Sequence, residues 1–474
     1  MSLARRLIQW PWSPPQSPKS EGNSTGNGFQ VLPRKRRARN KKLQNTDIIK
    51  GIMLCLWDNV SGPRTEQIWE GEEPLCTEML KYICRYTLGG EITHSTLSSE
   101  KTDPKGGLIS KFNLLPQYDF IVSCVVFEGK YYNGISSVSE SNTKWAFCIF
   151  VQRCFLQRYI KLHRIFEEEL HLIASILQHQ LNTKIPSESI QAISHRIELF
   201  VKFMTILTKN EAPKWNIDST FLGEAKSPFP KEFLNFAITS HLRSGSSVVV
   251  GAVEDIERIN MMINTLMMFT PREQHALCSH VREDYIPGLI LQGKTGDFDR
   301  LITIHSIYPS TVIEIAPGKM SVHLMNVKHH SKARDVLNQF YIESTEKSQD
   351  SLPDLLKEEF LFKSMKETSP FVNTLFNEIS PLPSPLRVPI ILHFRKFLER
   401  RSIVLIRFAE APDDTSGPRS GLKKRVKDLF NANEVDFAII LALAESISPG
   451  VSVKVYGTTQ DELEKRFNDL WGVG

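Results

Sequence analysis

The pattern of apolar and polar positions changes at Gly51, where short apolar runs bounded by turn residues begin. Residues 51–57 (GIMLCLW) predict a strand, and residues 64–69 predict its hairpin partner across a turn rich in Asp, Asn, Gly and Pro. A helix is expected over 74–88, because Leu75, Met79 and Ile83 recur at helical spacing before a Gly-Gly stop. Three further strands are predicted at residues 108–114, 120–127 and 145–151. The last two are so uniformly apolar that we expect them at the centre of a sheet.

Two amphipathic helices follow this sheet. Apolar positions from Leu162 to Leu177 lie on one helical face, and those from Ile190 to Leu207 lie on another. The second set alternates in steps of three and four, as in a coiled coil, but it covers fewer than three heptads, so a helix facing the core is favoured. The first block therefore has the predicted order β-β-α-β-β-β-α with a further helix.

A second α/β block begins near residue 231. A helix over 231–243, an apolar strand over 246–250 (SSVVV) and a returning helix from Ile256 to Leu266 are predicted, and Thr270, Pro271 and Glu273 signal a helix start. Further strands are expected at 288–292, 300–306, 311–316 and 451–456. From about Lys328 the pattern is mostly helical, with a polar break at 411–420.

Composition divides the chain further. The first segment is rich in Pro, Ser and Gly and ends in a basic run, Arg34–Lys42 (RKRRARNKK), which predicts a disordered arm able to contact an anionic membrane or to signal nuclear import. Residues 210–230 hold three prolines and no sustained periodicity, as in a linker. The expected segments are a basic arm (1–47), a first domain (48–210), a linker (211–230) and a second domain (231–474).

The charge balance depends on the arm. The chain has a net charge of +5, but residues 1–50 hold 11 of the 58 basic and 2 of the 53 acidic residues, which leaves a slightly acidic body. No nucleic-acid partner is therefore expected. Seven cysteines without C-x-x-C spacing indicate a reducing compartment, and no apolar run approaches the roughly 18 residues of a membrane span. A soluble, cytoplasmic protein is expected.

One motif suggests an enzyme. Residues 288–295 (GLILQGKT) match the phosphate-loop pattern G-x-x-x-x-G-K-[ST]. A working phosphate loop lies between a strand and a helix that starts at the Lys-Thr pair. Here Leu289–Leu291 predict a strand inside the supposed loop, so we expect a β-hairpin whose turn contains Lys294, with nucleotide hydrolysis as the less favoured alternative.

The remaining motifs have structural interpretations. The single glycine of VVVGAVEDI, Gly251, falls short of a dinucleotide-binding turn, and His275, Cys278 and His280 lack the second ligand pair of a zinc site. The methionines from Met261 to Met268 favour core packing over an adaptable binding surface. No nucleophile, metallohydrolase or cofactor signature is found, so we expect no cofactor and no catalytic residues.

Four runs in matching order resemble a known family. They are WDNVSGPRTEQIW (57–69), YTLGGEI (86–92), FLNFAITSHLRSGSSVVVG (233–251) and ALAESISPG (442–450). Together they resemble the DENN-module family named after chromosome nine open reading frame seventy-two, a gene linked to amyotrophic lateral sclerosis and frontotemporal dementia. The resemblance implies a longin domain, a five-stranded antiparallel sheet with flanking helices, followed by a DENN domain with an α/β part and then a helical part.

The resemblance also implies a function. Family members regulate Rab and Arf GTPases, as guanine-nucleotide exchange factors or as subunits of a GTPase-regulating complex, in autophagy and at endosomes and lysosomes. The implied partners are a second longin-DENN protein of the Smith-Magenis-region type, a WD-repeat protein and the GTPases. The alternative is a scaffold without catalysis that stabilises the partner DENN protein and recruits it to lysosomes.

Site residues follow only weakly from the sequence. The turn made by Trp57, Asp58, Gly62, Pro63 and Arg64 is a candidate interaction turn. Because the resemblance attributes the catalytic arginine of the complex to the partner, Arg64 is not assigned that role. Exchange needs no covalent chemistry, since a surface that prefers the nucleotide-free GTPase shifts the equilibrium.

Overall fold

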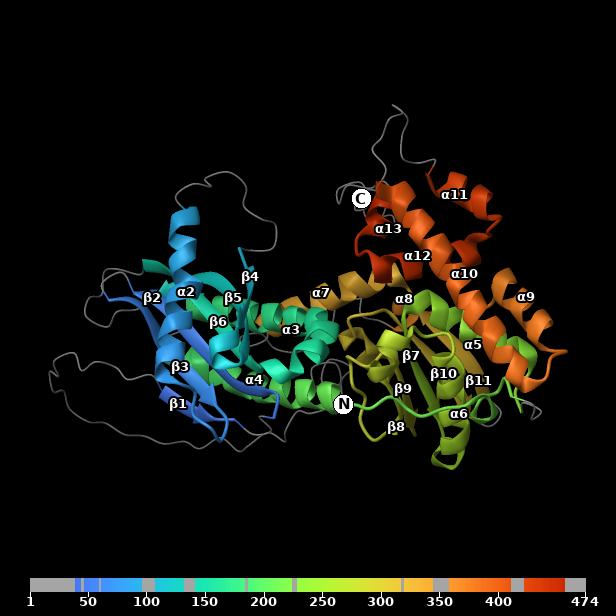
Figure 1. The fold of residues 1–474 in the computed structure, drawn as a ribbon, viewed down its shortest axis with the longest axis horizontal. Coiled ribbons are helices and arrows are strands. Elements are labelled where there is room, and N and C mark those ends of the chain that lie inside the picture. Colours follow the sequence, from blue (N-terminus) through green and yellow to red (C-terminus); the bar gives the residue numbers. More distant parts are fainter. Residues whose placement is uncertain are drawn as a thin grey trace. The chain divides into compact units, whose positions relative to one another are not determined.

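The structure is a computed structural model (Figure 1). It describes residues 39–43, 47–58, 61–95, 107–131, 141–183, 186–223, 228–316, 319–343, 358–410 and 422–456. The chain divides into two compact units, residues 1–209 with 336–350 and residues 210–335 with 351–474. None of the helices in the described ranges is long and apolar enough to cross a membrane. The polar break predicted at 411–420 lies outside the described residues.

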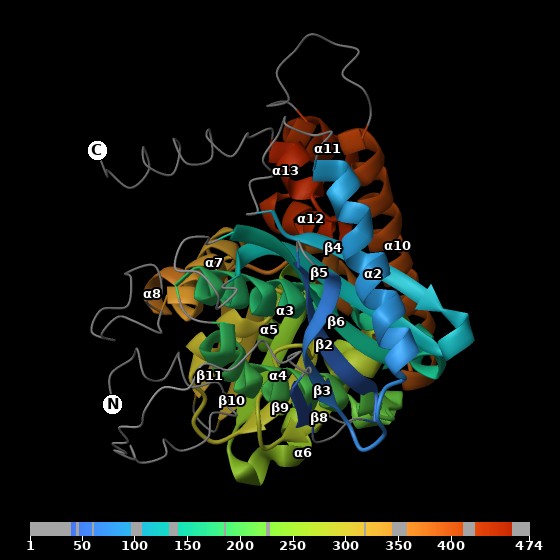
Figure 2. The ribbon, with the colours of Figure 1, turned by 90° about the vertical axis from the view of Figure 1, so that its left-hand side faces the viewer.

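The first unit contains one six-stranded sheet with helices on both of its faces (Figures 1 and 2). Its main elements are β1 (Arg39–Lys42), β2 (Ile49–Asp58), β3 (Gly62–Glu70), α2 (Thr77–Ser95), β4 (Ile109–Leu115), β5 (Phe120–Tyr131), β6 (Ser141–Gln152), α3 (Leu156–Thr183) and α4 (Pro186–Lys209). The strand order is β1-β3-β2-β6-β5-β4. Strands β2 to β6 are antiparallel to their neighbours, and β1 is parallel to β3.

The apolar strands explain this arrangement. As predicted, β5 and β6 are interior strands with buried side chains, because a strand with apolar residues on both faces must be covered on both. On one face Met79 and Ile83 of α2 pack against Met53 and Cys148. On the other face the buried Trp69 donates a hydrogen bond from Nε1 to Ser194 Oγ of α4, at 3.3 Å.

The prediction of a disordered arm is wrong at Arg39–Lys42, because these residues form β1. The backbone of β1 pairs with the outer edge of β3, and Leu43 N donates to Glu70 O at 2.7 Å. Lys41 Nζ lies 3.0 Å from Glu198 Oε1, so this lysine of the basic run is paired within the unit. Pairing of backbone groups does not depend on side-chain polarity, which is why the composition of the run concealed the strand. The rest of the arm, apart from Leu43 and Asp47, lies outside the described residues.

The second unit contains another six-stranded sheet, in the order β12-β11-β10-β7-β9-β8. Its strands and the helices beside them are α5 (Lys231–Ser244), β7 (Ser246–Gly251), α6 (Ile256–Met267), β8 (Cys278–Arg282), β9 (Leu291–Thr295), β10 (Ser310–Ala316), β11 (Lys319–Met325), α8 (Glu358–Leu361) and β12 (Phe362–Ser364). Of α7 (Val327–Glu343), residues 327–335 belong to this unit. Strand β7 is parallel to β9 and β10, and β8 is parallel to β9. Strands β10, β11 and β12 are antiparallel. The sheet is therefore mixed.

Helices complete the second unit. They are α9 (Pro370–Ile379), α10 (Ser384–Glu410), α11 (Leu422–Phe430), α12 (Glu434–Ile447) and α13 (Val451–Tyr456). Side chains from α5, α6, α9 and α10 share one core with the sheet. In the helical part, the guanidinium of Arg401 lies over the rings of Phe397, Phe371 and Phe430, with its carbon 3.9, 4.7 and 5.4 Å from the ring centroids. These contacts connect α9, α10 and α11. The predicted combination of a mixed α/β chain with a helical C-terminal part is confirmed.

Several element predictions in the second unit are wrong. Residues 300–306 form a 3-10 helix (Arg300–His305) instead of a strand, because the side chain of Asp299 accepts a hydrogen bond from Leu301 N at 3.0 Å and starts a turn. Residues 451–456 form α13 instead of a strand, since buried Val451 and Val455 share one helical face. The strand predicted at 288–292 is shifted to Leu291–Thr295, and β8 and β11 were not predicted.

The predicted linker is not wholly solvated in the structure. Phe221, Leu222 and Phe229 are buried in the core of the second unit. Thr265 Oγ1 accepts a hydrogen bond from Phe221 N at 2.9 Å, and Arg387 Nη1 donates to the carbonyl oxygens of Leu222 and Gly223 at 2.9 and 2.7 Å. The described residues of this segment thus contribute apolar side chains to the core of the second unit.

Close packing of α6 on the second sheet depends on glycine. A Cβ atom on Gly293 would lie 2.7 Å from Ile259 Cγ2, 2.9 Å from Ile263 Cδ1 and 2.9 Å from Val281 Cγ2. Gly251 on the neighbouring strand would place a Cβ 3.1 Å from Ile315 and 3.2 Å from Ile259. Both glycines therefore make room for one isoleucine of α6.

We expect Gly293→Ala to lower the free energy of unfolding by about 1–3 kcal/mol, because the added methyl group overpacks a filled core. Chemical denaturation of the purified protein measures the effect. Gly89→Ala is the matched control, since Gly89 lies in α2 with no atom within 4 Å of the added Cβ. That control should be neutral or slightly stabilising. Equal effects of the two substitutions would contradict the packing role of Gly293.

Two buried histidines make the second unit sensitive to acid. His241 contacts Ser247 Oγ through Nδ1 at 2.9 Å and Thr270 Oγ1 through Nε2 at 3.0 Å. His330 Nε2 donates to Ser306 O at 3.0 Å. Burial lowers the pKa of His241 from 6.5 to about 4, and burial, reinforced by the positive charge of Arg334, lowers the pKa of His330 to about 4.

Between pH 6.5 and pH 4 the unfolded chain binds protons at these two positions and the folded chain does not. The free energy of unfolding of the second unit should therefore be highest above pH 6.5 and should fall as the pH drops from 6.5 to 4. Urea denaturation at pH 7.5 and pH 5 tests this, and His241→Gln should flatten the dependence. His393→Gln, at an exposed position of α10, is the control. A stability that does not change between the two pH values would refute the prediction.

Candidate interaction surface

Strand β4 is the last strand of the first sheet. Among the described residues it pairs only with β5, in the register from Ile109 opposite Val126 to Leu115 opposite Phe120. At the opposite end of the sheet β1 is the last strand and pairs with β3. The outer side of β4 therefore presents backbone N–H and C=O groups with no partner strand in the described part of the chain, which is the usual template for pairing with another chain.

Large apolar side chains line this edge on the α3 face. Phe112 and Leu114 are 47% and 41% exposed. The Phe112 ring stacks on Tyr159, with centroids 5.7 Å apart, and tilts against His163 at 6.2 Å. Burial raises the pKa of Tyr159 to about 12, so its phenol is neutral beneath the exposed Phe112. On the α3 face of β4, Phe112 and Leu114 thus form an exposed apolar surface, and the buried ring of Tyr159 supports Phe112 from below.

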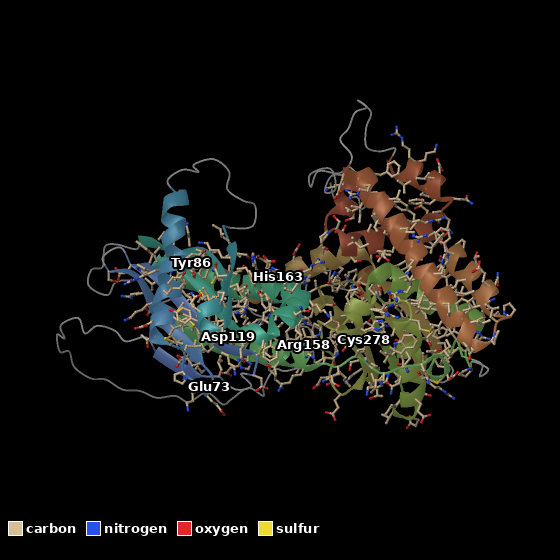
Figure 3. All side chains as sticks on the ribbon, viewed as in Figure 1. Glu73, Tyr86, Asp119, Arg158, His163 and Cys278 are labelled. Carbon is tan, nitrogen blue, oxygen red and sulfur yellow. The ribbon has the colours of Figure 1, made fainter. Side chains whose placement is uncertain are left out.

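Tyrosines line the α2 face. Tyr82 and Tyr86 are 43% and 54% exposed and stack with centroids 6.0 Å apart, and Tyr118 lies 6.5 Å from Tyr82. Lys111 Nζ of β4 donates to Thr87 O of α2 at 2.8 Å and fixes the strand to this helix. In Figure 3, Tyr86 lies on α2 and His163 on α3.

We call the set of Ile109, Phe112 and Leu114 of β4 with Tyr82, Tyr86 and Tyr118 the edge surface. An unpaired strand flanked by exposed aromatic and aliphatic side chains combines backbone hydrogen bonding with anchors for a partner. This surface was not predicted from the sequence. The alternation of 108–114 and the i, i+4 spacing of Tyr82 and Tyr86 were visible, but the sequence does not show which strand lies at the edge.

The predicted interaction turn lies elsewhere in the same sheet. Trp57 pairs with Pro63 and Asp58 with Gly62 at the end of the β2–β3 hairpin, and Gly62 has a φ of 76°. Because β6 and β5 lie between β2 and β4, these residues do not join the edge surface. Asn59 and Val60 lie outside the described residues, and the turn remains a predicted contact site.

Arg64 is held by carboxylates of its own hairpin. Its Nη1 lies 3.1 Å from Asp58 Oδ2 and its Nη2 lies 3.1 Å from Glu66 Oε2. Asp58 is buried and also accepts a hydrogen bond from Ser61 N at 3.3 Å. This arrangement stabilises the hairpin.

The phosphate-loop match is not a loop. Lys294 lies inside β9, which is parallel to β7 and β8, so the expected hairpin with Lys294 in its turn is wrong. Leu289, Ile290 and Leu291 are buried, and Gly293 is required by packing. The glycines and the lysine of the pattern thus lie in and before a core strand, a geometry that gives no wrapped phosphate cradle.

The His-Cys cluster also has structural partners. His275 Nε2 lies 3.1 Å from the carbonyl oxygens of Met267 and Thr270, and His280 Nε2 donates to Asn264 Oδ1 at 2.8 Å. Burial raises the pKa of Cys278 (Figure 3) to about 12. Among the described residues no group of three or more His, Cys, Asp or Glu side chains is placed to hold a metal ion. Met262, Met267 and Met268 are buried, as expected for core packing.

Replacing Arg64 with Ala should destabilise the first unit by about 1–2 kcal/mol, because it removes the ion pair that Arg64 makes with the buried Asp58 carboxylate. Thermal and chemical denaturation measure the loss. Arg164→Ala is the control, since Arg164 pairs with Glu168 at 3.2 Å while its side chain is 48% exposed. That exposed pair should contribute less than about 1 kcal/mol. An Arg64→Ala variant as stable as the parent would contradict the structural role.

Comparison with known proteins identifies relatives along most of the chain. The model of the C9orf72-like protein family matches residues 90–330. The human protein named guanine nucleotide exchange factor C9orf72 is 26% identical over 465 residues, covering 85% of this chain and 91% of that protein. Its rat and mouse homologues are each 27% identical over 462 residues, with the same coverage. Because the family match spans just over half of the 474 residues, this chain belongs to the C9orf72-like protein family.

Proposed function

We propose that the protein regulates small GTPases of the Rab or Arf class by protein binding, as an exchange factor or as a subunit of a GTPase-regulating DENN complex. The observation that supports this most strongly is the similarity, along 85% of the chain, to proteins named guanine nucleotide exchange factors. The expected setting is autophagy and traffic at endosomes and lysosomes.

The proposed domain assignment follows the family. The five antiparallel strands β2 to β6 with α2, α3 and α4 correspond to a longin domain over residues 48–210. The mixed sheet followed by α9 to α13 corresponds to a DENN domain over residues 231–474, with 211–230 as a connecting segment. In this proposal the protein regulates GTPases through its binding surfaces. A complex that binds the nucleotide-free GTPase more tightly than the loaded form accelerates nucleotide release.

The edge surface is the proposed site for a second longin-DENN protein, with a WD-repeat protein as a further subunit. An edge strand of the partner would continue the sheet beyond β4, while Tyr82, Tyr86, Phe112 and Leu114 would be covered. Arg64 is not proposed as a catalytic arginine, because Asp58 and Glu66 hold it in the hairpin. As the family resemblance implies, the arginine for stimulated hydrolysis is proposed to come from the partner subunit.

The test uses the full chain purified with its partner. Release of a fluorescent GDP analogue from a panel of Rab and Arf proteins should accelerate when the complex is added. The double variant Tyr86→Asp/Leu114→Asp should lose the partner, with affinity reduced by about 30-fold or more, because it places charge in the proposed interface. Val253→Asp is the matched control, since Val253 is 62% exposed in the second unit.

Two results would contradict the proposal. No effect on release or hydrolysis by any GTPase would remove the regulatory function. Partner binding that survives the double variant, or that is lost equally in the control, would remove the edge surface as the docking site.

The alternative of a scaffold is supported by the same edge surface, because this surface would allow partner binding without any contact to a GTPase. In that case the double variant would abolish lysosomal recruitment of the partner, while a preassembled complex would have no direct effect on nucleotide release.

A further inference from the structure

Helix α10 is held on the second unit through one side. Its later turns share a core with α11, α12 and α13 (Figure 1). Ser402 Oγ lies 3.0 Å from Ile440 O of α12 and 3.0 Å from Leu398 O of its own helix, which fixes the rotation of α10 about its axis. Leu405 and Ile406 are buried on the same side as Ser402. The opposite side of the helix is therefore held toward solvent.

The outward side of these turns carries apolar and basic side chains together. Three large apolar residues and three cations are exposed on it, and we call this set the α10 face: Lys396, Arg400, Ile403, Val404, Arg407 and Phe408. They lie on one side of the helix because successive positions in the set are three or four residues apart. Ile403, Val404 and Phe408 are 43%, 37% and 44% exposed. Arg407 lies 3.8 Å from Glu410, but with 80% of its side chain exposed this pair contributes little.

Helix α11 adds a second set of the same kind. Its buried residues Val426 and Phe430 pack in the core that it shares with α10. Lys427 Nζ lies 2.6 Å from the carboxylate of the first residue of α12, so this side of α11 is turned toward α12. Leu429, which is 58% exposed, and the exposed Arg425 lie on the opposite side of α11 from Lys427. The outer side of α11 therefore presents an apolar residue beside a cation.

Basic residues concentrate in the same two segments. Residues 395–410 and 422–430 hold nine Lys or Arg and three Asp or Glu, a net charge of +6. Residues 51–474 as a whole hold 47 basic and 51 acidic residues, which leaves 38 against 48, a net charge of −10, for the rest of that range. Five of the nine large hydrophobic side chains that are exposed in the described residues of the second unit also lie in α10 and α11. Positive charge and apolar exposure thus coincide on these two helices.

This combination fits an anionic lipid bilayer. Exposed aromatic and aliphatic side chains enter the boundary between headgroups and acyl chains, while Lys and Arg beside them bind phosphates and lay their aliphatic stems along the apolar surface. Each cation near an anionic leaflet adds an attraction that salt screens. An acidic protein needs carboxylates fixed opposite the cations, whereas lipid headgroups rearrange around cations spread over two helices. A bilayer is therefore the better match.

We propose that the α10 face and the outer side of α11 bind an anionic membrane surface peripherally. Val404, Phe408 and Leu429 enter the headgroup boundary, and Arg400 and Arg407 contact lipid phosphates. The axis of α10 then lies along the membrane plane. This surface is distinct from the edge surface of the first unit, and the inference does not depend on the GTPase proposal.

The test is sedimentation of the purified full chain with vesicles of phosphatidylcholine that contain about 30% phosphatidylserine. The chain should pellet with these vesicles, should not pellet with pure phosphatidylcholine, and should be released as the salt concentration rises. Val404→Glu/Phe408→Glu should weaken binding about tenfold or more, because it places charge where apolar side chains enter the membrane. Val253→Glu/Met320→Glu is the matched control, since these residues are 62% and 44% exposed elsewhere in the second unit, and its binding should not change.

Arginine variants identify the contribution of charge. Arg400→Gln/Arg407→Gln should weaken vesicle binding about tenfold or more. Arg400→Lys/Arg407→Lys should retain it, because a fluid lipid surface requires the charge and not the fixed fork of a guanidinium. Lys41→Gln/Lys42→Gln is the control, since it removes the same charge from exposed positions of β1. The denaturation midpoint should be the same for all these variants, because the substituted side chains are exposed.

Several results would overturn the proposal. They are equal binding to neutral vesicles, no binding to anionic vesicles, binding that the α10 variants leave unchanged, and a loss in either control as large as in the α10 variants. A chain that ignores anionic vesicles but binds a polyglutamate peptide through Arg400 and Arg407 would also overturn it, since the partner would then be an acidic protein.

Discussion

An open β-sheet must end, and its last strands carry backbone donors and acceptors that have no neighbour. In the first unit this constraint is met differently at the two edges. At one edge β1 pairs with β3, although its sequence is basic and polar. At the other edge, β4 has no further strand among the described residues and is bordered by exposed aromatic side chains. The β4 edge is the proposed partner site because exposed aromatic and aliphatic side chains border it.

The side chains behind β4 hold this edge strand in place. Phe112 stacks on Tyr159, which is buried, and Lys111 is bonded to the backbone of α2, so the strand is held in place from both faces. A rigid edge binds a partner strand with a smaller loss of conformational entropy than a mobile one. The hairpin ion pair of Arg64 and Asp58 has a similar effect at the end of β2 and β3.

In the second unit the governing contact is the approach of α6 to the sheet. Ile259 lies against both Gly251 and Gly293, positions where a methyl group would meet its side chain. Gly293 is also one of the glycines of the phosphate-loop pattern. The structure explains this glycine by its packing against α6. The buried histidines His241 and His330, each hydrogen-bonded, follow the same rule that polar groups inside a core need partners.

The sequence by itself determined much of the order of the helices and strands. Apolar periodicity predicted β2, β5, β6, α3, α5, β7 and α6 within a few residues, because burial of one or both faces dictates where apolar residues recur. It failed where the deciding interaction was not recorded in hydrophobicity. Strand β1 depends on backbone pairing with β3, the Arg300–His305 turn depends on the Asp299 side chain, and α13 depends on a neighbouring helical core.

Only the tertiary structure decided which residues form the candidate site. The tyrosines of α2 and the apolar residues of β4 are separated in sequence, and their proximity follows from the strand order β1-β3-β2-β6-β5-β4. Strand order is set by long-range packing and leaves no local pattern, so the sequence could show that β4 is a strand but not that it lies at an edge. The same reason applies to Lys294. Its neighbours in sequence match a phosphate-loop pattern, but the tertiary structure places this lysine in a core strand.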